Sequence, residues 1–324
     1  STVTLLNVET ITGGASSEVI TLGTAVTSGT IDLGGGIDRI TLGSRSMMDQ
    51  LEQLTPNPAQ VYAVGIEFIG TNYRGWQRQI DAIGVQAVIE NALSKIANEP
   101  IELIAAGRTD AGVHAGNMVA HFTTHAKRPV YNWLRGVNSM LPDDIALRWM
   151  VPMPDDLHAR FSAIARRYRY ITLNQPYRPA ILRHQVTHEY TPLDIDKMIQ
   201  ASQLLVGTHD FSSFRAAACQ SNQPVRTVSH AELFRHGAYL VFDIQADGFL
   251  HHMVRNIMGA LFAIGRGEMA VDALMPLIHA KDRTLAPPTA SADGLYFINA
   301  YYPEHFQTLL PDEPLTPLWL NLPK

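Results

Sequence analysis

Hydrophobic and polar residues alternate at the start of the region that follows residue 60. Tyr62, Val64, Ile66 and Phe68 occupy every second position, which predicts a strand with one buried face. After Gly84 the apolar period lengthens to that of an amphipathic helix, expected over residues 85–96. The same reading predicts further strands at 101–106, 119–123, 166–173, 226–235, 239–246 and 295–301, and further helices at 130–141, 194–206, 251–264 and 271–279.

Strands separated by long helices, with some strands adjacent in sequence, predict an α+β fold. We expect a mixed or antiparallel sheet covered on one side by helices. The second half of the chain repeats the plan of the first loosely. Proline and aspartate gather near residues 150–160, which favours a boundary there. The expected units are 61–155, which contains a candidate aspartate loop, and 156–324, which contains an arginine-rich segment.

Residues 1–46 differ from the rest of the chain. They contain eight glycines and nine threonines, and no proline, aromatic residue, histidine or lysine. Residues 13–21 and 33–41 resemble degraded nonapeptide repeats of calcium-binding β-rolls, but two repeats are too few to bury a continuous core. We expect an upstream extension or fusion remnant outside the folded core, with an ordinary start at Met47 or Met48 and a linker over 47–60.

Composition limits the class of protein. The chain has 324 residues, of which 46% are hydrophobic and 17% charged, and its formal charge is -5. One cysteine, Cys219, allows no intramolecular disulfide, which fits a reducing cytoplasm. No apolar run has membrane-spanning length and no secretory signal pattern appears at the start, so we expect no membrane partner. The net charge argues only mildly against nucleic-acid binding, because it says little about local charge.

A glycine-flanked carboxylate is the first candidate for chemistry. Asp110 lies within Ala106–Ala115, directly after an apolar run, with Arg108 two residues before it and His114 four residues after it. A loop at the end of a strand is a common place for a catalytic side chain. An ordinary turn is the alternative, because threonine and aspartate between glycines are typical turn residues.

Between Leu157 and His188 the chain has six arginines and no acidic residue. Such a segment is typical of contacts to phosphate. On the predicted strand Tyr168 and Tyr170 share one face, and the arginines at 167 and 169 share the other. The alternative is a solvated strand face with core tyrosines.

The apolar segment Gly248–Ile257 contains an arginine. A buried, unpaired Arg255 would be costly, so it needs a partner, for which Asp110 is the candidate; alternatively its head reaches water. His251 and His252 are expected to point apart on a helix. His114, His121 and His125 could converge, but with one cysteine and no paired motif we expect no metal site.

Several segments, in order from about Tyr62 to the C-terminus, together resemble the tRNA pseudouridine synthase A family. They are Gly75–Gln79, Ala106–His114, Phe161–Ala163 with Arg166–Tyr170, Phe211–Arg215, His251–Ile257, Lys281–Leu285 and Gly294–Tyr296. The run Gly107–His114 is the most specific of them. Residues 1–46 have no counterpart.

The resemblance implies an isomerase that converts uridine to pseudouridine in the anticodon stem-loop of tRNA, at positions 38, 39 and 40, without metal or cofactor. By position, the nucleophile is Asp110, the base-stacking tyrosine and candidate proton acceptor is Tyr168, and the arginine paired with the nucleophile is Arg255. Arg108 resembles the residue that holds the target base flipped out, and Leu295 resembles the apolar wall of the pocket. The further implied tRNA contacts are Arg128, Leu157, His158, Ala159, Arg160, Phe161, Cys219, Gln220, Ser221, Asn222 and Gln223.

The residues themselves agree with such chemistry. One isolated carboxylate can attack or stabilise an electron-poor sugar or base centre, whereas a hydrolase would need a second carboxylate and a water. The family fold is two ferredoxin-like halves whose sheets merge across a central cleft, and the family is a homodimer that binds tRNA across both subunits. Two alternatives stay open: an RNA-binding protein without catalysis, and a metal-dependent nucleic-acid hydrolase built on the histidines.

Overall fold

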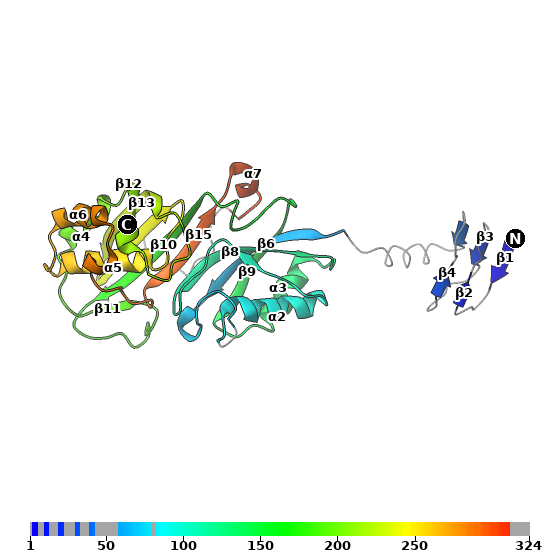
Figure 1. Cartoon of the computed structure of the whole chain (residues 1–324). Coiled ribbons are helices and arrows are strands. Elements are labelled where there is room, and N and C mark those ends of the chain that lie inside the picture. Colours follow the sequence, from blue (N-terminus) through cyan, green and yellow to red (C-terminus); the bar gives the residue numbers. More distant parts are fainter. Residues whose placement is uncertain are drawn as a thin grey trace. The chain divides into compact units, whose positions relative to one another are not determined.

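A computed structural model describes residues 58–79 and 82–311 of the chain, together with the backbone of five short strands before residue 43. The chain falls into two units, Ser1–Pro58 and Ala59–Lys324. In the first unit two parallel sheets are present, one in the order β1-β3-β5 and one made of β2 and β4, which the composition did not predict (Figure 1). These strands are β1 (Thr2–Leu5), β2 (Thr10–Thr12), β3 (Val19–Leu22), β4 (Thr30–Asp32) and β5 (Arg39–Leu42). The proposed repeat turns and the linker at 47–57 lie outside the described residues.

The second unit contains a ten-stranded sheet in the order β12-β13-β14-β10-β15-β8-β6-β9, with β11 beside β10 and β7 beside β8. Along this path β15 and β8 pair in parallel and the other neighbours are antiparallel. The expected mixed sheet of an α+β fold is therefore confirmed. The strands are β6 (Gln60–Phe68), β7 (Ile104–Ala105), β8 (His114–Thr124), β9 (Ile145–Met153), β10 (Ala165–Asn174), β11 (Thr187–Glu189), β12 (Gly207–Asp210), β13 (Val225–His236), β14 (Tyr239–Ala246) and β15 (Leu295–Tyr301).

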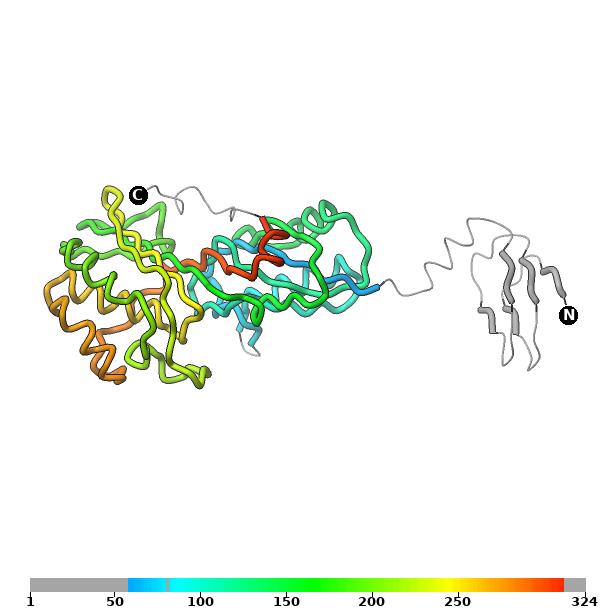
Figure 2. The backbone as a smooth tube through the Cα atoms, turned by 90° about the horizontal axis from the view of Figure 1, so that it is seen from above, coloured from blue at the N-terminus to red at the C-terminus, as the bar shows by residue number. Residues whose placement is uncertain are grey.

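The parallel pairing of β15 with β8 joins strands from two parts of the chain. On one side lie strands from residues 60–153, and on the other lie strands from residues 165–301. Figure 2 shows the last strand returning to the middle of this unit between these two parts. The similarity of the two parts to each other and the central cleft remain predictions.

Helices pack at both ends of the sheet. Helix α2 (Val85–Ala97) buries the apolar face that its period predicted and packs beside α3 (Val130–Asn138), whereas α4 (Ile195–Gln203) packs on β13 and on α5 (Met253–Gly265) (Figure 1). Two short helices, α6 (Leu274–Ala280) and α7 (Glu304–Gln307), complete the set of α-helices among the described residues. None of the helices in this described part is long and apolar enough to cross a membrane.

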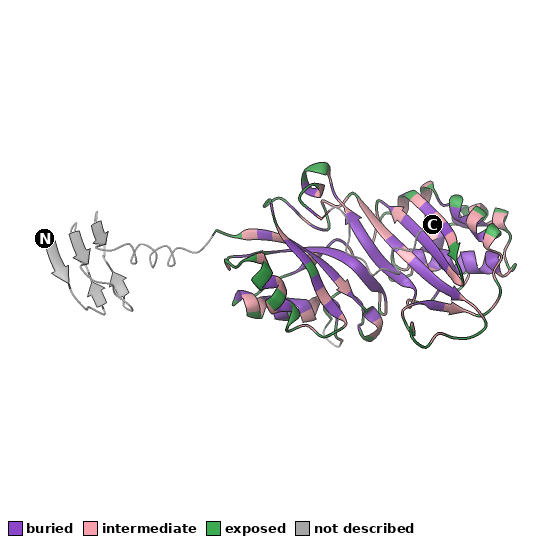
Figure 3. Cartoon of the chain, turned by 180° about the vertical axis from the view of Figure 1, so that it is seen from behind, coloured by how far each residue is buried: buried purple, intermediate pink, exposed green. Residues whose placement is uncertain are grey.

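One large core cluster extends along the strands, and a smaller one contains Ile171, Leu173, Val186, Tyr296 and Ile298; Figure 3 shows the buried residues. Every residue of α5 is buried except Arg255. Arg255 is therefore the one charged side chain of a largely buried helix, and its partner is part of the candidate site.

Some predicted boundaries were wrong. The strand expected at 101–106 is only the two residues of β7, and β8 begins at His114 rather than near 119. Strands β9, β11 and β12 were not predicted. Pro152 lies inside β9, which is an edge strand where a missing N–H costs no ladder hydrogen bond.

Candidate active site

The loop that carries Asp110 is held from several sides. The N–H of Val113 donates to the carbonyl of Asp110 at 3.1 Å, which closes the turn, and the N–H of Trp76 donates to the carbonyl of Thr109 at 3.1 Å. Gly75 has φ +91°, and a Cβ there would lie 2.5 Å from the Thr109 oxygen. The segment around Gly75 and Trp76 thus braces the aspartate loop, and only glycine fits at this close approach.

Three nitrogen donors surround the Asp110 carboxylate. The Arg255 Nη1 atom lies 3.4 Å from Oδ2, His251 Nε2 lies 3.3 Å from Oδ1, and His252 Nε2 lies 3.5 Å from Oδ2. The Arg255 Nε atom also donates to the carbonyl of Ala290 at 2.9 Å, which fixes the guanidinium. The expected pairing of Arg255 with Asp110 is confirmed. The Asp110 side chain keeps 18% of its surface exposed, so it remains accessible.

The expectation that His251 and His252 point apart on a helix was wrong. Both residues precede α5, and His252 adopts a left-handed backbone with φ 63° and ψ 3°. This turn places the two rings 4.1 Å apart and brings both of them to Asp110. Burial lowers the pKa of His252, an effect that the Asp110 carboxylate opposes.

The spacing of this cluster is also suitable for a metal ion. One ligand atom from each of Asp110, His251 and His252 lies within 4.8 Å of the others, the one such group in the described part of the chain. Arg255 contacts the same carboxylate, however, and its positive charge disfavours a cation there. The site therefore fits a carboxylate held by donors better than a metal centre.

Tyr168 lies on β10 beside the site. Its ring is 8% exposed and meets the edges of Phe249 and Phe297 at centroid distances of 5.0 and 5.2 Å. A β-bulge between residues 167 and 168, on the side of β15, adjusts the strand at this point. The hydroxyl has no hydrogen-bond partner among the described residues, and burial, with a contribution from Asp110, raises its pKa. Tyr168 therefore presents a neutral hydroxyl. Leu295, opposite Tyr170 in the sheet, is buried.

The structure brings the segment Cys219–Gln223 to the aspartate loop. The exposed Arg108 donates from Nη1 to Oε1 of Gln220 at 3.1 Å, and the N–H of His251 donates to Sγ of Cys219 at 3.4 Å. Burial lowers the pKa of Arg108, and the nearby Arg160 contributes to the same effect. Segments more than 100 residues apart in sequence thus meet beside Asp110.

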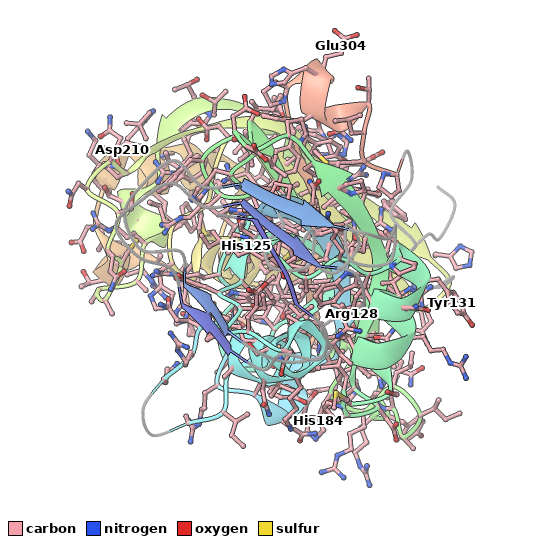
Figure 4. All side chains as sticks on the ribbon, turned by 90° about the vertical axis from the view of Figure 1, so that its right-hand side faces the viewer. His125, Arg128, Tyr131, His184, Asp210 and Glu304 are labelled. Atoms are coloured by element: carbon pink, nitrogen blue, oxygen red, sulfur yellow. The ribbon has the colours of Figure 1, made fainter. Side chains whose placement is uncertain are left out.

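Of the stretch 157–161, Leu157 and Ala159 are buried. Phe161 is 77% exposed, stacks on His158 at 4.3 Å and has the Arg160 guanidinium 5.6 Å from its ring centroid. The exposed part of this stretch is therefore a cation and an aromatic ring. Arg128 is exposed between β8 and α3, close in sequence to the exposed Tyr131, and both are labelled in Figure 4.

Arginines of the basic strand bond within the protein. Arg167 and Arg169 contact the buried Asp243 at 2.5 Å each, on the face opposite the tyrosines, as the strand period predicted. Arg166 donates to carbonyl oxygens, among them that of Ala106 at the start of the aspartate loop. These partners lie within the protein, and contact of the arginine-rich segment with phosphate stays a prediction.

Two histidines considered as metal ligands serve the fold instead. The His114 Nδ1 atom accepts the N–H of Gly70 at 2.9 Å, and its ring stacks on Tyr296 at 4.7 Å. The His121 Nδ1 atom accepts the N–H of Ala159 at 3.1 Å. Burial lowers the pKa of each imidazole to about 4. His125 is exposed.

Sequence reasoning missed the residues that support α5. The Asn256 amide donates to the carbonyl of Phe214 at 2.8 Å, and Arg283 donates to Oδ1 of Asn256 at 3.1 Å. The Ser213 hydroxyl donates to the carbonyl of Leu277 at 2.6 Å. Ser213 and Phe214 lie in the motif Phe211–Arg215, Arg283 lies in Lys281–Leu285, and Asn256 lies in His251–Ile257. The sequence marked these segments but not this role, which is to support the helix that presents Arg255.

Comparison with known proteins identifies the family of this chain. The model of a family described as tRNA pseudouridine synthase matches residues 65–162 and 201–303, which places the chain among the pseudouridine synthases. A tRNA pseudouridine synthase A of Acinetobacter baumannii (strain SDF) is 60% identical over 266 residues, 82% of this chain and 100% of that protein. The same-named protein of Vibrio cholerae (strain O395) is 54% identical over 258 residues, 80% of this chain and 97% of that protein. The chain belongs to the tRNA pseudouridine synthase A family.

Among solved structures, a chain of a Cbf5-Nop10-Gar1 complex is similar at 11% identity, with a TM-score of 0.29, over 72% of this chain and 57% of that chain. A superposition this loose supports no conclusion.

Proposed function

We propose that this protein converts uridine to pseudouridine in the anticodon stem-loop of tRNA, with Asp110 as the nucleophile. The observation that carries the proposal is the convergence of three groups from distant parts of the chain. Asp110 comes from the loop before β8, Arg255 from α5 and Tyr168 from β10. The guanidinium compensates the negative charge of the carboxylate, and the tyrosine ring offers a surface on which a base can stack.

The reaction needs only rearrangement of bonds. The bond between C1′ and N1 of uridine breaks, the base turns, and a bond forms between C1′ and C5. A proton leaves C5 and N1 gains one, so nothing is oxidised or reduced. Asp110 stabilises the electron-poor centre while the base is detached. Tyr168, whose hydroxyl is neutral and has no partner among the described residues, is suited to relay the C5 proton.

The target uridine has to leave the stacked loop before its glycosidic bond is accessible. Arg108 is exposed two residues before Asp110 and donates a hydrogen bond to Gln220, which supports a role in holding the flipped-out nucleotide. Arg160 and the exposed Phe161 provide a charge and a stacking ring for neighbouring nucleotides. The same proposal includes a cytoplasmic homodimer in which tRNA contacts both subunits. It also confines the catalytic role to residues after 46.

Tritium release from tRNA labelled at uridine C5 tests the proposal. Purified protein should release tritium without cutting the RNA, and equally well in the presence of a chelator. Binding of tRNA without release would favour an RNA-binding protein. Release that fails after chelation, or cleavage of the chain, would favour a metal-dependent enzyme.

A further inference from the structure

Two adjacent histidines before helix α5 face the same carboxylate, that of Asp110. Successive residues of an α-helix project about 100° apart, so a regular helix through residues 251 and 252 could turn only one ring toward Asp110. Here His251 Nε2 approaches one carboxylate oxygen at 3.3 Å and His252 Nε2 approaches the other at 3.5 Å.

The backbone conformation of His252 makes this arrangement possible. Among the described residues four non-glycines have positive φ: Asn98, His184, His252 and Lys281. Asn98 and Lys281 end helices α2 and α6, where a left-handed residue is usual. His252 instead stands before a helix, where an extended cap residue is the norm. A left-handed histidine is energetically unfavourable, and such strain persists where other contacts impose it, often at functional sites.

Neighbouring contacts hold both residues in place. The N–H of His251 donates to Sγ of Cys219, the carbonyl of His251 accepts the N–H of Ala216 at 3.0 Å, and the carbonyl of His252 accepts the N–H of Asn256 at 2.9 Å. The side chains of His251 and His252 keep 38% and 30% of their surface, so they line the accessible side of the site.

Arg255 contacts only Oδ2 of Asp110, which leaves Oδ1 without that restraint. We propose that His251 and His252 are positioning residues for the reaction: each imidazole binds one oxygen of Asp110, and together they fix the plane of the carboxylate toward the substrate. The contacts of 3.3 to 3.5 Å are long for hydrogen bonds, as is common before substrate binds, and we expect them to shorten in the complex. This inference rests on the proposed role of Asp110 as nucleophile.

The substitution His252→Gly tests the inference, because it removes the ring and relieves the strained backbone together. We expect an unchanged or higher melting temperature, an unchanged Kd for tRNA, and a kcat lowered about 10- to 100-fold, the size typical of a displaced reacting group. His252→Asn, which tolerates the left-handed backbone and keeps an N–H donor, should restore part of kcat. His251→Ala should lower kcat without lowering tRNA affinity.

The matched control is His184→Gly. His184 has φ 61° and is exposed in the segment before β11, and its ionic contact is with Asp293 rather than Asp110; it is labelled in Figure 4. Its replacement should leave kcat unchanged. Wild-type kcat in both His252→Gly and His251→Ala would overturn the inference, as would a loss of kcat that follows a fall in melting temperature. Asp110→Asn, assayed in parallel, separates the two proposals: full activity in that variant would instead refute the nucleophile.

Discussion

Two aspartates of this protein are each surrounded by the nitrogen atoms of arginine or histidine side chains, but in different ways. Asp243 is 1% exposed and contacts Arg167 and Arg169 at 2.5 Å. Asp110 is 18% exposed and contacts Arg255, His251 and His252 at 3.3 to 3.5 Å. The first carboxylate has its hydrogen-bonding capacity taken up by close donors inside the sheet. The second carboxylate has more distant donors, and part of its surface is exposed to solvent.

The difference is that between a structural ion pair, at Asp243, and a carboxylate with room for a ligand, at Asp110. Short contacts around a fully buried charge leave no position for a further partner, and breaking them leaves charges without compensation. Long contacts around a partly exposed charge leave room for a substrate, and the donors can move closer when it binds. Removing the charge at Asp110 should therefore affect activity, and removing the charge at Asp243 should affect stability.

The largest expected effect is that of Asp110→Asn on activity. Asparagine keeps the size of the side chain but not its charge, so tritium release should fall by a factor of at least about 10⁴. The melting temperature and the Kd for tRNA should stay close to wild type, because Arg255 keeps its bond to Ala290. Turnover by purified Asp110→Ala would refute the assignment.

Asp243→Asn should have the opposite profile. It leaves Arg167 and Arg169 without their shared carboxylate, and loss of one partner from a buried ion pair costs about 3–5 kcal/mol of unfolding free energy. Urea unfolding measures the change. Well below its melting temperature the variant should retain kcat. An unfolding free energy equal to that of wild type would show that Asp243 does not hold the sheet as described.

Substitutions of Tyr168 test the role of the side chain that lies beside Asp110. Tyr168→Phe keeps the ring between Phe249 and Phe297 and loses no hydrogen bond to the described residues, so stability should hardly change. If the hydroxyl relays the C5 proton as we propose, its loss should lower kcat by about 10²-fold. Tyr168→Leu should lower both kcat and tRNA affinity, because the stacking surface also disappears. Wild-type turnover by the phenylalanine variant would leave stacking as the only role.

The stability of the protein at acid pH tests the buried imidazoles of His114 and His121, which bond to the backbone rather than to Asp110. The pKa values of His114 and His121 are about 4 in the folded protein, below their ordinary value of 6.5, so on acidification the unfolded state binds protons first. Their contribution is complete above about pH 6.5 and is lost as the pH falls toward 4. At pH 5 each should reduce the unfolding free energy by about 2 kcal/mol. His114→Gln and His121→Gln, compared with wild type by urea unfolding at pH 7.5 and 5, should each show a smaller pH dependence; an undiminished one would contradict this.

The smallest expected effect is that of deleting residues 1–46. These residues belong to the unit Ser1–Pro58, whereas both aspartates lie in the other unit. Melting temperature and tritium release should therefore stay nearly unchanged, with or without calcium. A truncated protein that is insoluble, inactive or several degrees less stable would make this segment a working part of the enzyme.

Periodicity predicted the long regular elements, because burial of one face imposes a period on β6, α2 and β15. The pairing of Arg255 with Asp110 was also predictable, since a cation in an apolar helix needs a partner. Strand β9 was missed because Pro152 was taken as a boundary, although an edge strand accepts proline.

Other features could not be predicted from local patterns. Asp243 lies 76 residues from Arg167, so the ion pair depends on which strands become neighbours. No residue type at position 252 predicts the left-handed backbone of His252. This conformation turns His251 and His252 toward Asp110, although they were expected to point apart. These two features decide which arginines bind partners inside the sheet and which side chains surround Asp110.

The most direct test of the central claim is a mass-spectrometric map of pseudouridine in an unmodified tRNA transcript after incubation with the purified protein. With the wild-type chain we predict pseudouridine in the anticodon stem-loop, and with Asp110→Asn none, while Asp243→Asn still produces it at a temperature at which it is folded. Unmodified uridine after incubation with the wild-type protein, or pseudouridine produced by Asp110→Asn, would contradict the account.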